Sequence, residues 1–201
     1  MPSADYQKMV DDLATARRIT YNVPDLACNT TIQELKIKSY ILMAHAIIEE
    51  YLENISLHVA KEAIRELNSN STVTTALLGL ISSGIIGRIE EDGISRKIKR
   101  EPFEDLKLFA ETAFGRFKTV VSSNNGIKKE DQLKLLIPIG IDPETEDPAT
   151  MAALDSFGGK RGAIAHVFKI SKSHTLSEID GDLKTIRLGL LNYDSACLAN
   201  V

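Results

Sequence analysis

The sequence predicts an all-α fold, and three observations support this prediction. Apolar residues recur at the three- and four-residue spacing of amphipathic helices in nearly every segment of the chain. No segment shows the alternation of apolar and polar residues, bounded by hairpin turns, that is typical of strands. Hydrophobic residues make up 43% of the 201 residues and charged residues 26%, which are ordinary values for a folded protein and exclude a disordered or fibrous one. We therefore expect a bundle of long helices.

The first expected helix covers residues 4–19, and a proline-containing connector follows over residues 21–29. The next helix is expected over residues 31–67, where Thr31 and Glu34 form a capping box at its start. One face of this helix carries a continuous apolar stripe, made of Ile37, Ile41, Ala44, Ile48, Leu52, Ile55 and Val59. A helix of this length can form the spine of a bundle.

Residues 73–86 are apolar almost all round, which indicates burial on several sides or a contact with another chain. A charged connection fills residues 90–101, and a further helix is expected to begin near Pro102, with an inward face of Phe103, Leu106, Phe109, Ala113 and Phe117. This helix is expected to end in left-handed backbone at Asn125 and Gly126.

Residues 128–137 predict a short helix closed by Pro138, followed by a loop. Asp147 and Pro148 then read as an N-cap with proline at the first helical position, so a helix is expected over residues 148–157.

Two glycines, Gly158 and Gly159, are expected to interrupt this helix before helical spacing resumes over residues 161–170. Thr175 and Glu178 form a second capping box, which begins a closing helix that reaches about residue 199.

Charge and cysteine content exclude several classes of protein. A formal charge of −4 excludes a general nucleic-acid coat, so any nucleic-acid site must be local. Cys28 and Cys197 form no CxxC pair, which argues against a disulfide framework or zinc ribbon and fits a reducing cytoplasm. No signal-like segment opens the chain, and the longest apolar stretch, residues 76–87, is shorter than the ~20 residues of a membrane span. We expect a cytoplasmic protein with no membrane contact.

The most informative segment is RGAIAH at residues 161–166, directly after the glycine pair. A guanidinium is always charged and an imidazole titrates near pH 6.5, so Arg161 and His166 suit the clamping and cleavage of a phosphodiester without metal. Five residues of regular helix turn through about 500°, which would leave the two side chains about 140° apart. We therefore expect the glycines to place Arg161 at a helix start, where an anion meets the opening N–H groups and His166 stays neutral. The spacing alone favours a structural interpretation, in which Arg161 pairs with a carboxylate and His166 lies at the edge of the core.

The segment around this motif is basic in an otherwise acidic protein. No acidic residue occurs between Phe157 and Leu176, a stretch that contains Lys160, Arg161, Lys169 and Lys172. Lys160 and Lys169 are therefore predicted to bind a phosphate-containing substrate, with an ordinary solvated helix face as the alternative.

No metal or cofactor is expected. His45 and Glu49 have the i, i+4 spacing of a metal pair, but no second pair or cysteine cluster accompanies them, which favours a hydrogen bond. The GGKRG segment lacks the first glycine and the Ser or Thr of a P-loop.

Three stretches resemble the HEPN superfamily, in particular its RiboL-PSP-HEPN branch: SYILMAHAIIEEYLENI at residues 39–55, NNGIKKEDQLKLLIPIGI at residues 124–141 and DSFGGKRGAIAH at residues 155–166. The resemblance implies a bundle of long antiparallel helices with the motif-bearing helix near the C-terminus. It also implies a homodimer and a metal-independent endoribonuclease site where two R-x4-6-H motifs meet, with Arg161 and His166 as the catalytic residues.

Family resemblance carries further expectations. It divides the chain into an N-terminal helical extension, residues 1–29, and a HEPN-like domain, residues 30–201. It implies RNA as the substrate, a toxin or phage-defence role, and a neutralising antitoxin as a partner. Members often carry an acidic residue on the early long helix, which Glu49 or Glu50 would supply here.

Many members have a polar residue directly after the motif arginine, and this chain has Gly162. The alternative to an enzyme is therefore a dimerising RNA-binding or regulatory module that no longer cuts. A third possibility is a module that pairs with a nucleotidyltransferase.

Overall fold

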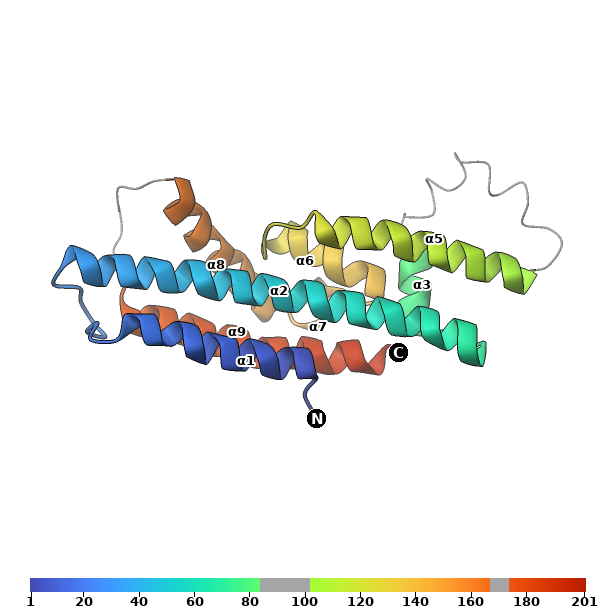
Figure 1. The fold of residues 1–201 in the computed structure, drawn as a ribbon, viewed down its shortest axis with the longest axis horizontal. Coiled ribbons are helices and arrows are strands. Elements are labelled where there is room, and N and C mark those ends of the chain that lie inside the picture. The colour runs from blue at the N-terminus through green and yellow to red at the C-terminus, as the bar shows by residue number, and fades with distance from the viewer. Residues whose placement is uncertain (84–101, 167–173) are drawn as a thin grey trace.

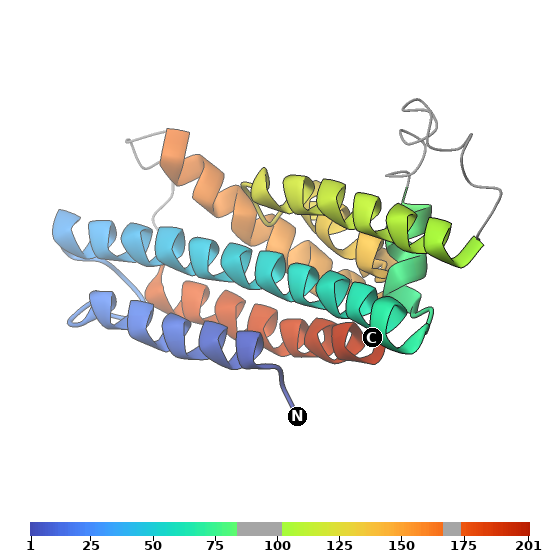
Figure 2. The ribbon, with the colours of Figure 1, turned by 45° about the vertical axis from the view of Figure 1, so that its right-hand side comes forward.

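The computed structural model describes residues 1–83, 102–166 and 174–201. Every regular element within these residues is a helix, which confirms the all-α prediction. The long helix α2 (Thr31–Asn70) runs through the middle of the bundle (Figure 1). Helices α1 (Ala4–Ala16) and α9 (Leu176–Ala199) lie along one side of it, and α5 (Pro102–Ser122) and α8 (Pro148–His166) lie on the other (Figures 1 and 2).

The predicted apolar stripe of α2 is confirmed, because all seven of its residues are buried. Helix α2 begins at Thr31, as predicted, but its N-cap is the preceding residue. Thr30 has extended backbone and its hydroxyl accepts a hydrogen bond from the backbone N–H of Gln33 at 3.2 Å, so Thr30 and not Thr31 is the N-cap.

Residues 1–29 pack against the same core as the rest of the described chain. The short 3-10 helix η1 (Arg17–Thr20) follows α1, and Arg17 pairs with Asp180 of α9 at 2.8 Å. The fully buried carboxylate of Asp194 in α9 accepts a hydrogen bond from the backbone N–H of Ser3 at 2.7 Å. Residues 1–29 thus pack on the helical bundle of their own chain. The division of the chain into an extension, residues 1–29, and a domain, residues 30–201, stays a prediction.

Helix α3 (Thr75–Ser82) buries Ala76, Leu77 and Leu80 but exposes Leu78, so this apolar segment is covered on one side and not all round. The second half of the segment, from residue 84, and the charged connection lie outside the described residues. In α5 the expected inward face is confirmed at Ala113 and Phe117, which are fully buried, while Leu106 and Phe109 are half-buried. The side chain of Phe103 is not among those described.

The predicted left-handed stop at Asn125 and Gly126 is wrong, because neither residue has a positive φ. Helix α5 ends at Ser122, and the side chain of Asn124 then donates to the carboxylate of Glu53 at 2.8 Å. A Cβ on Gly126 would collide with the carboxylate of Asp131. Glycine here lets the backbone lie close to this carboxylate, and it does not serve a left-handed backbone conformation.

Helix α6 (Lys129–Leu136) continues into the 3-10 helix η3 (Ile137–Ile139), which confirms the short helix. The loop expected before Asp147 contains one helical turn, α7 (Pro143–Glu146). Asp147 caps α8 as predicted, because its carboxylate accepts from the backbone N–H of Thr150 at 3.0 Å.

The predicted interruption at Gly158 and Gly159 is also wrong, since α8 runs unbroken from Pro148 to His166. A glycine inside a helix costs only about 1 kcal/mol relative to alanine, which tertiary packing overrides. Gly158 is buried, and a Cβ there would lie 2.9 Å from the Lys128 side chain. The absence of a side chain at Gly158 therefore allows Lys128, which directly precedes α6, to pack closely against α8.

Thr175 caps α9, as predicted, by accepting from the backbone N–H of Glu178 at 3.1 Å. No helix in the described ranges is long and apolar enough to cross a membrane.

Candidate functional site

Arg161 lies on α8 at the level of His45 and Glu49 on α2, where these two helices pack. Its side chain is half-buried, and its positive charge lowers the pKa of both residues, although burial has the larger effect on each. No described residue forms a hydrogen bond or ion pair with Arg161. Its guanidinium is therefore available to an anionic ligand.

His45 is buried, and its Nδ1 lies 3.5 Å from a carboxylate oxygen of Glu49, so the expected contact between the two is present. Burial and then the charge of Arg161 lower the pKa of His45 to about 4. The imidazole is therefore neutral at pH 7 and adds no positive charge near Arg161.

The structure distinguishes the two candidate acidic residues of α2. Glu49 is half-buried, and burial and the neighbouring Glu53 raise its pKa against the opposing effect of Arg161. Glu50 is exposed and pairs with Lys8 of α1 at 2.8 Å. Of the two, only Glu49 faces the motif arginine.

Two further carboxylates belong to this neighbourhood, and the sequence reasoning did not include them. Asp131 of α6 raises the pKa of both His45 and Glu49, and Glu53 raises that of Glu49. The spacing of residues 45, 49 and 53 along one face of α2 was a readable signal for Glu53. Asp131 enters only through the packing of α6 on α2.

The continuous α8 removes the helix start that was expected at Arg161. A site in which an anion binds opening N–H groups beside Arg161 is therefore wrong. His166 is the last residue of α8, so a helix start does not keep it neutral, and its side chain lies outside those described. Along an unbroken helix, residues five apart point about 140° away from each other. The backbone positions of residues 161 and 166 therefore lie about 140° apart around the axis of α8.

The side chain of Lys160 points toward α9 and not toward the contact of α8 with α2. Its ammonium contacts the carboxylates of Glu178, at 3.0 Å, and of Asp182, both on α9. A phosphate would have to compete with these two carboxylates for Lys160. His174 joins the group through a 3.4 Å contact with Glu178.

The predicted basic strip is therefore divided between two faces at Lys160 and Arg161, which are neighbours about 100° apart on the helix. Lys169 and Lys172 lie outside the described residues.

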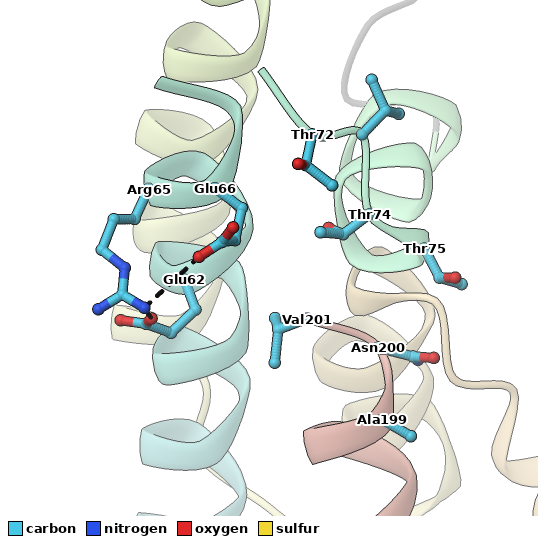
Figure 3. Close-up of a pocket in the computed structure, with 10 residues that line it drawn as sticks. Glu62, Arg65, Glu66, Thr72, Thr74, Thr75, Ala199, Asn200 and Val201 are labelled. Atoms are coloured by element: carbon cyan, nitrogen blue, oxygen red, sulfur yellow. Dashed lines mark ion pairs between the residues drawn. The ribbon is translucent and has the colours of Figure 1, made fainter. Parts of the chain in front are cut away.

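A hollow of about 470 Å³ lies at the other end of the bundle, between the C-terminal end of α2 and the start of α3 (Figure 3). Arg65 at its edge is held by Glu62 at 2.6 Å and Glu66 at 3.6 Å. The arginine is thus already neutralised, so this hollow offers no anion site.

Comparison with known proteins gave one result. The profile of a family described as RiboL-PSP-HEPN matches residues 12–188, which include the whole of α2 and α8. No curated protein and no solved structure matches the chain.

Proposed function

The chain belongs to the RiboL-PSP-HEPN family, and on that premise we propose that it is a metal-independent endoribonuclease whose site is shared by two copies of the chain. The observation that supports this proposal best is the placement of Arg161. Its guanidinium is half-buried beside a neutral histidine and a carboxylate, and no described residue is paired with it. Such a group binds a phosphate without first breaking an internal ion pair.

RNA supplies its own nucleophile, which spares the protein a reactive side chain or a metal. His166 accepts the proton of the 2′-hydroxyl while the 2′-oxygen forms a bond to phosphorus and the bond from phosphorus to the 5′-oxygen breaks. The partner subunit's His166 or water gives a proton to the leaving 5′-oxygen. Arg161 holds the phosphate and offsets its charge in the transition state. The products are a 2′,3′-cyclic phosphate and a 5′-hydroxyl.

The geometry of α8 supports sharing between chains. Because positions 161 and 166 lie about 140° apart around the axis of one helix, we expect a phosphate held by the arginine of one copy to meet the histidine of another copy. RNA and a second copy of the chain are thus the proposed partners, with Lys160 and Lys169 as proposed further phosphate contacts.

The test is digestion of a mixed RNA pool by wild type, Arg161→Ala and His166→Ala in the presence of a metal chelator. Arg65→Ala and His58→Ala are matched controls, since both residues lie on α2 beyond the contact with Arg161. We expect wild type and controls to give cyclic-phosphate ends and the two motif variants to cut at least ~100-fold more slowly. Equal cleavage by all five proteins refutes the assignment.

Gly162 favours the alternative, an RNA-binding or regulatory module that does not cut. A Cβ at this position would meet no atom within 4 Å, so packing does not require glycine here. The missing polar side chain is then a chemical difference and not a steric one. Binding of RNA by wild type with no cleavage, together with cleavage gained in Gly162→Asn, would establish this alternative.

A toxin or phage-defence role, with a neutralising protein partner, is proposed from family membership alone. Induction of the wild-type gene is expected to arrest growth, and Arg161→Ala or His166→Ala is expected to relieve the arrest. Unchanged growth on induction of wild type would count against a toxin.

A further inference from the structure

The N-terminal half of α2 exposes an apolar face, which we call the open face. Its residues lie at helical spacing on one side of α2 and are exposed by 64%, 41%, 38% and 43%, in the order Ile32, Leu35, Leu42 and Met43. Ala46 continues the same face and is also exposed. Soluble proteins rarely expose contiguous apolar surface of this kind unless it binds something.

The open face is the uncovered half of a longer apolar stripe. Leu57 and Ile64 continue it toward the C-terminal end of α2, and there both are partly buried in the core. Helix α5 packs along that half of α2 (Figures 1 and 2). The cover ends where Asn124, just after α5, binds Glu53. The part of α2 nearer its start is left open by the described helices.

The charge pattern of α2 favours a second copy of the chain, and not RNA, as the binding partner of the open face. Residues 39–48, SYILMAHAII, contain no lysine, arginine, aspartate or glutamate, so the middle of the open face offers nothing to an RNA backbone. It also offers no like-charge repulsion to another copy of itself. Lys38 precedes this neutral stretch and Glu49 follows it. An antiparallel pairing of two copies therefore places the basic end of each face near the acidic end of the other.

We propose that the open face of α2 docks onto the open face of a second copy, about a twofold axis that passes near Leu42 and Met43. His45 and Glu49 then lie within about two helical turns of the axis. The two Arg161 environments are brought within roughly 10–15 Å of each other along α2. This inference deepens the proposed function, because it names the surface that assembles the shared site.

The first experiment measures mass by sedimentation at micromolar concentration for wild type, Leu42→Glu and Leu188→Glu. Leu188 is the matched control, because it is a leucine of α9 that is 55% exposed away from the open face. We expect dimers for wild type and Leu188→Glu, and at least ~100-fold weaker association for Leu42→Glu with unchanged helical circular dichroism. A monomeric wild type, or a Leu42→Glu protein that stays dimeric, overturns the inference.

A second variant does not depend on disrupting the fold. In a Cys28→Ser background, Met43→Cys is expected to form disulfide-linked dimers under mild oxidation, because the axis brings both copies of position 43 together. Leu188→Cys should remain uncrosslinked. Equal crosslinking of the two variants, or none at position 43, counts against the proposed axis.

RNA cleavage separates this inference from the proposed function. Dimers that depend on Leu42 but cut no RNA would leave the interface standing and remove the nuclease. A wild type that cuts RNA while Leu42→Glu stays dimeric and active would do the reverse. Loss of RNA binding by a still dimeric Leu42→Glu would assign the open face to RNA and overturn the inference.

Discussion

Glu49 and Glu50 are chemically identical neighbours, yet the 100° step of the helix gives them different partners. Glu49 faces Arg161, and Glu50 binds Lys8 at the surface. Glu49→Gln is therefore expected to lower RNA cleavage about tenfold or more, equivalent to ~1.4 kcal/mol, because it removes the negative charge beside Arg161 and the contact of Glu49 with His45. Initial cleavage rates under identical conditions provide the measurement.

Glu50→Gln is the matched control for this prediction. Exposed ion pairs contribute on the order of 0–1 kcal/mol, so its loss should leave cleavage unchanged and stability nearly so. Equal effects of the two substitutions would show that Glu49 has no special relation to the motif arginine.

Because His45 is buried and has a lowered pKa, we expect the stability of the protein to depend on pH in a specific way. Its pKa in the folded protein is about 4, below the ordinary value of 6.5, because it is buried and near Arg161. Between pH 6.5 and 4 the unfolded chain binds a proton that the folded chain does not. The stability contributed by neutral His45 is thus complete above pH 6.5 and falls as the pH decreases toward 4.

Urea unfolding of wild type and His45→Gln at several pH values between 7 and 4.5 tests this. The wild type should lose up to ~1.4 kcal/mol per pH unit more than the variant, which corresponds to one proton. The same substitution at the exposed His58 serves as the control. A wild-type slope equal to that of His45→Gln would contradict the burial of a neutral histidine.

At the scale of the helices, two glycines of α9 have opposite environments. Gly189 is buried, and a Cβ there would collide with the side chain of Thr150 at the start of α8. Gly181 is exposed and a Cβ would meet nothing within 4 Å. Gly181→Ala is therefore expected to stabilise the protein by about 0.5–1 kcal/mol, and Gly189→Ala to destabilise it by about 1–3 kcal/mol.

Thermal or urea unfolding of the two variants provides the comparison. Because both residues lie in the same helix, the gain in helix propensity is shared and the difference between them reports the contact of α9 with α8. Similar stability of both variants would mean that α8 and α9 do not approach this closely.

The glycines illustrate which features of the fold could be predicted from the sequence and which could not. Helix type and the buried stripe of α2 could be predicted, because both follow from local periodicity. The effect of a glycine could not, since three different causes look alike in a sequence. Gly140 has left-handed backbone, Gly126 and Gly158 allow close packing, and Gly159 has no steric reason in the described structure. Only tertiary contacts separate these cases.

The neighbourhood of Arg161 was predictable to the same limited extent. The RGAIAH motif, and Glu49 and Glu50 as the two acidic candidates, could be predicted from residue type and family resemblance, but the choice between the two glutamates required the structure. That Lys160 turns toward α9, and that Arg161 lies near His45, depends on how α8 packs against two other helices. Sequence spacing does not contain that information.

At the scale of the whole molecule, the unbroken α8 makes the number of chains in one site testable by mixing. Arg161→Ala and His166→Ala are each expected to be inactive alone. If a site takes its arginine from one copy and its histidine from another, a mixed dimer keeps one site with both residues intact. Equal amounts of the two variants, co-expressed or allowed to exchange, should then recover about a quarter of the wild-type activity. Half of the dimers are mixed and each has one of two sites, which gives this fraction.

A mixture that recovers no activity is equally informative. If Arg161 and His166 act together within one chain, both sites of a mixed dimer lack one residue, and the mixture stays as inactive as its components. Adding Leu42→Glu to both variants supplies the control, because recovery that depends on docking through α2 must then disappear. Recovery of activity that persists after Leu42→Glu is added would show that the shared site does not depend on the open face. No recovery by the original mixture would show that Arg161 and His166 act within one chain.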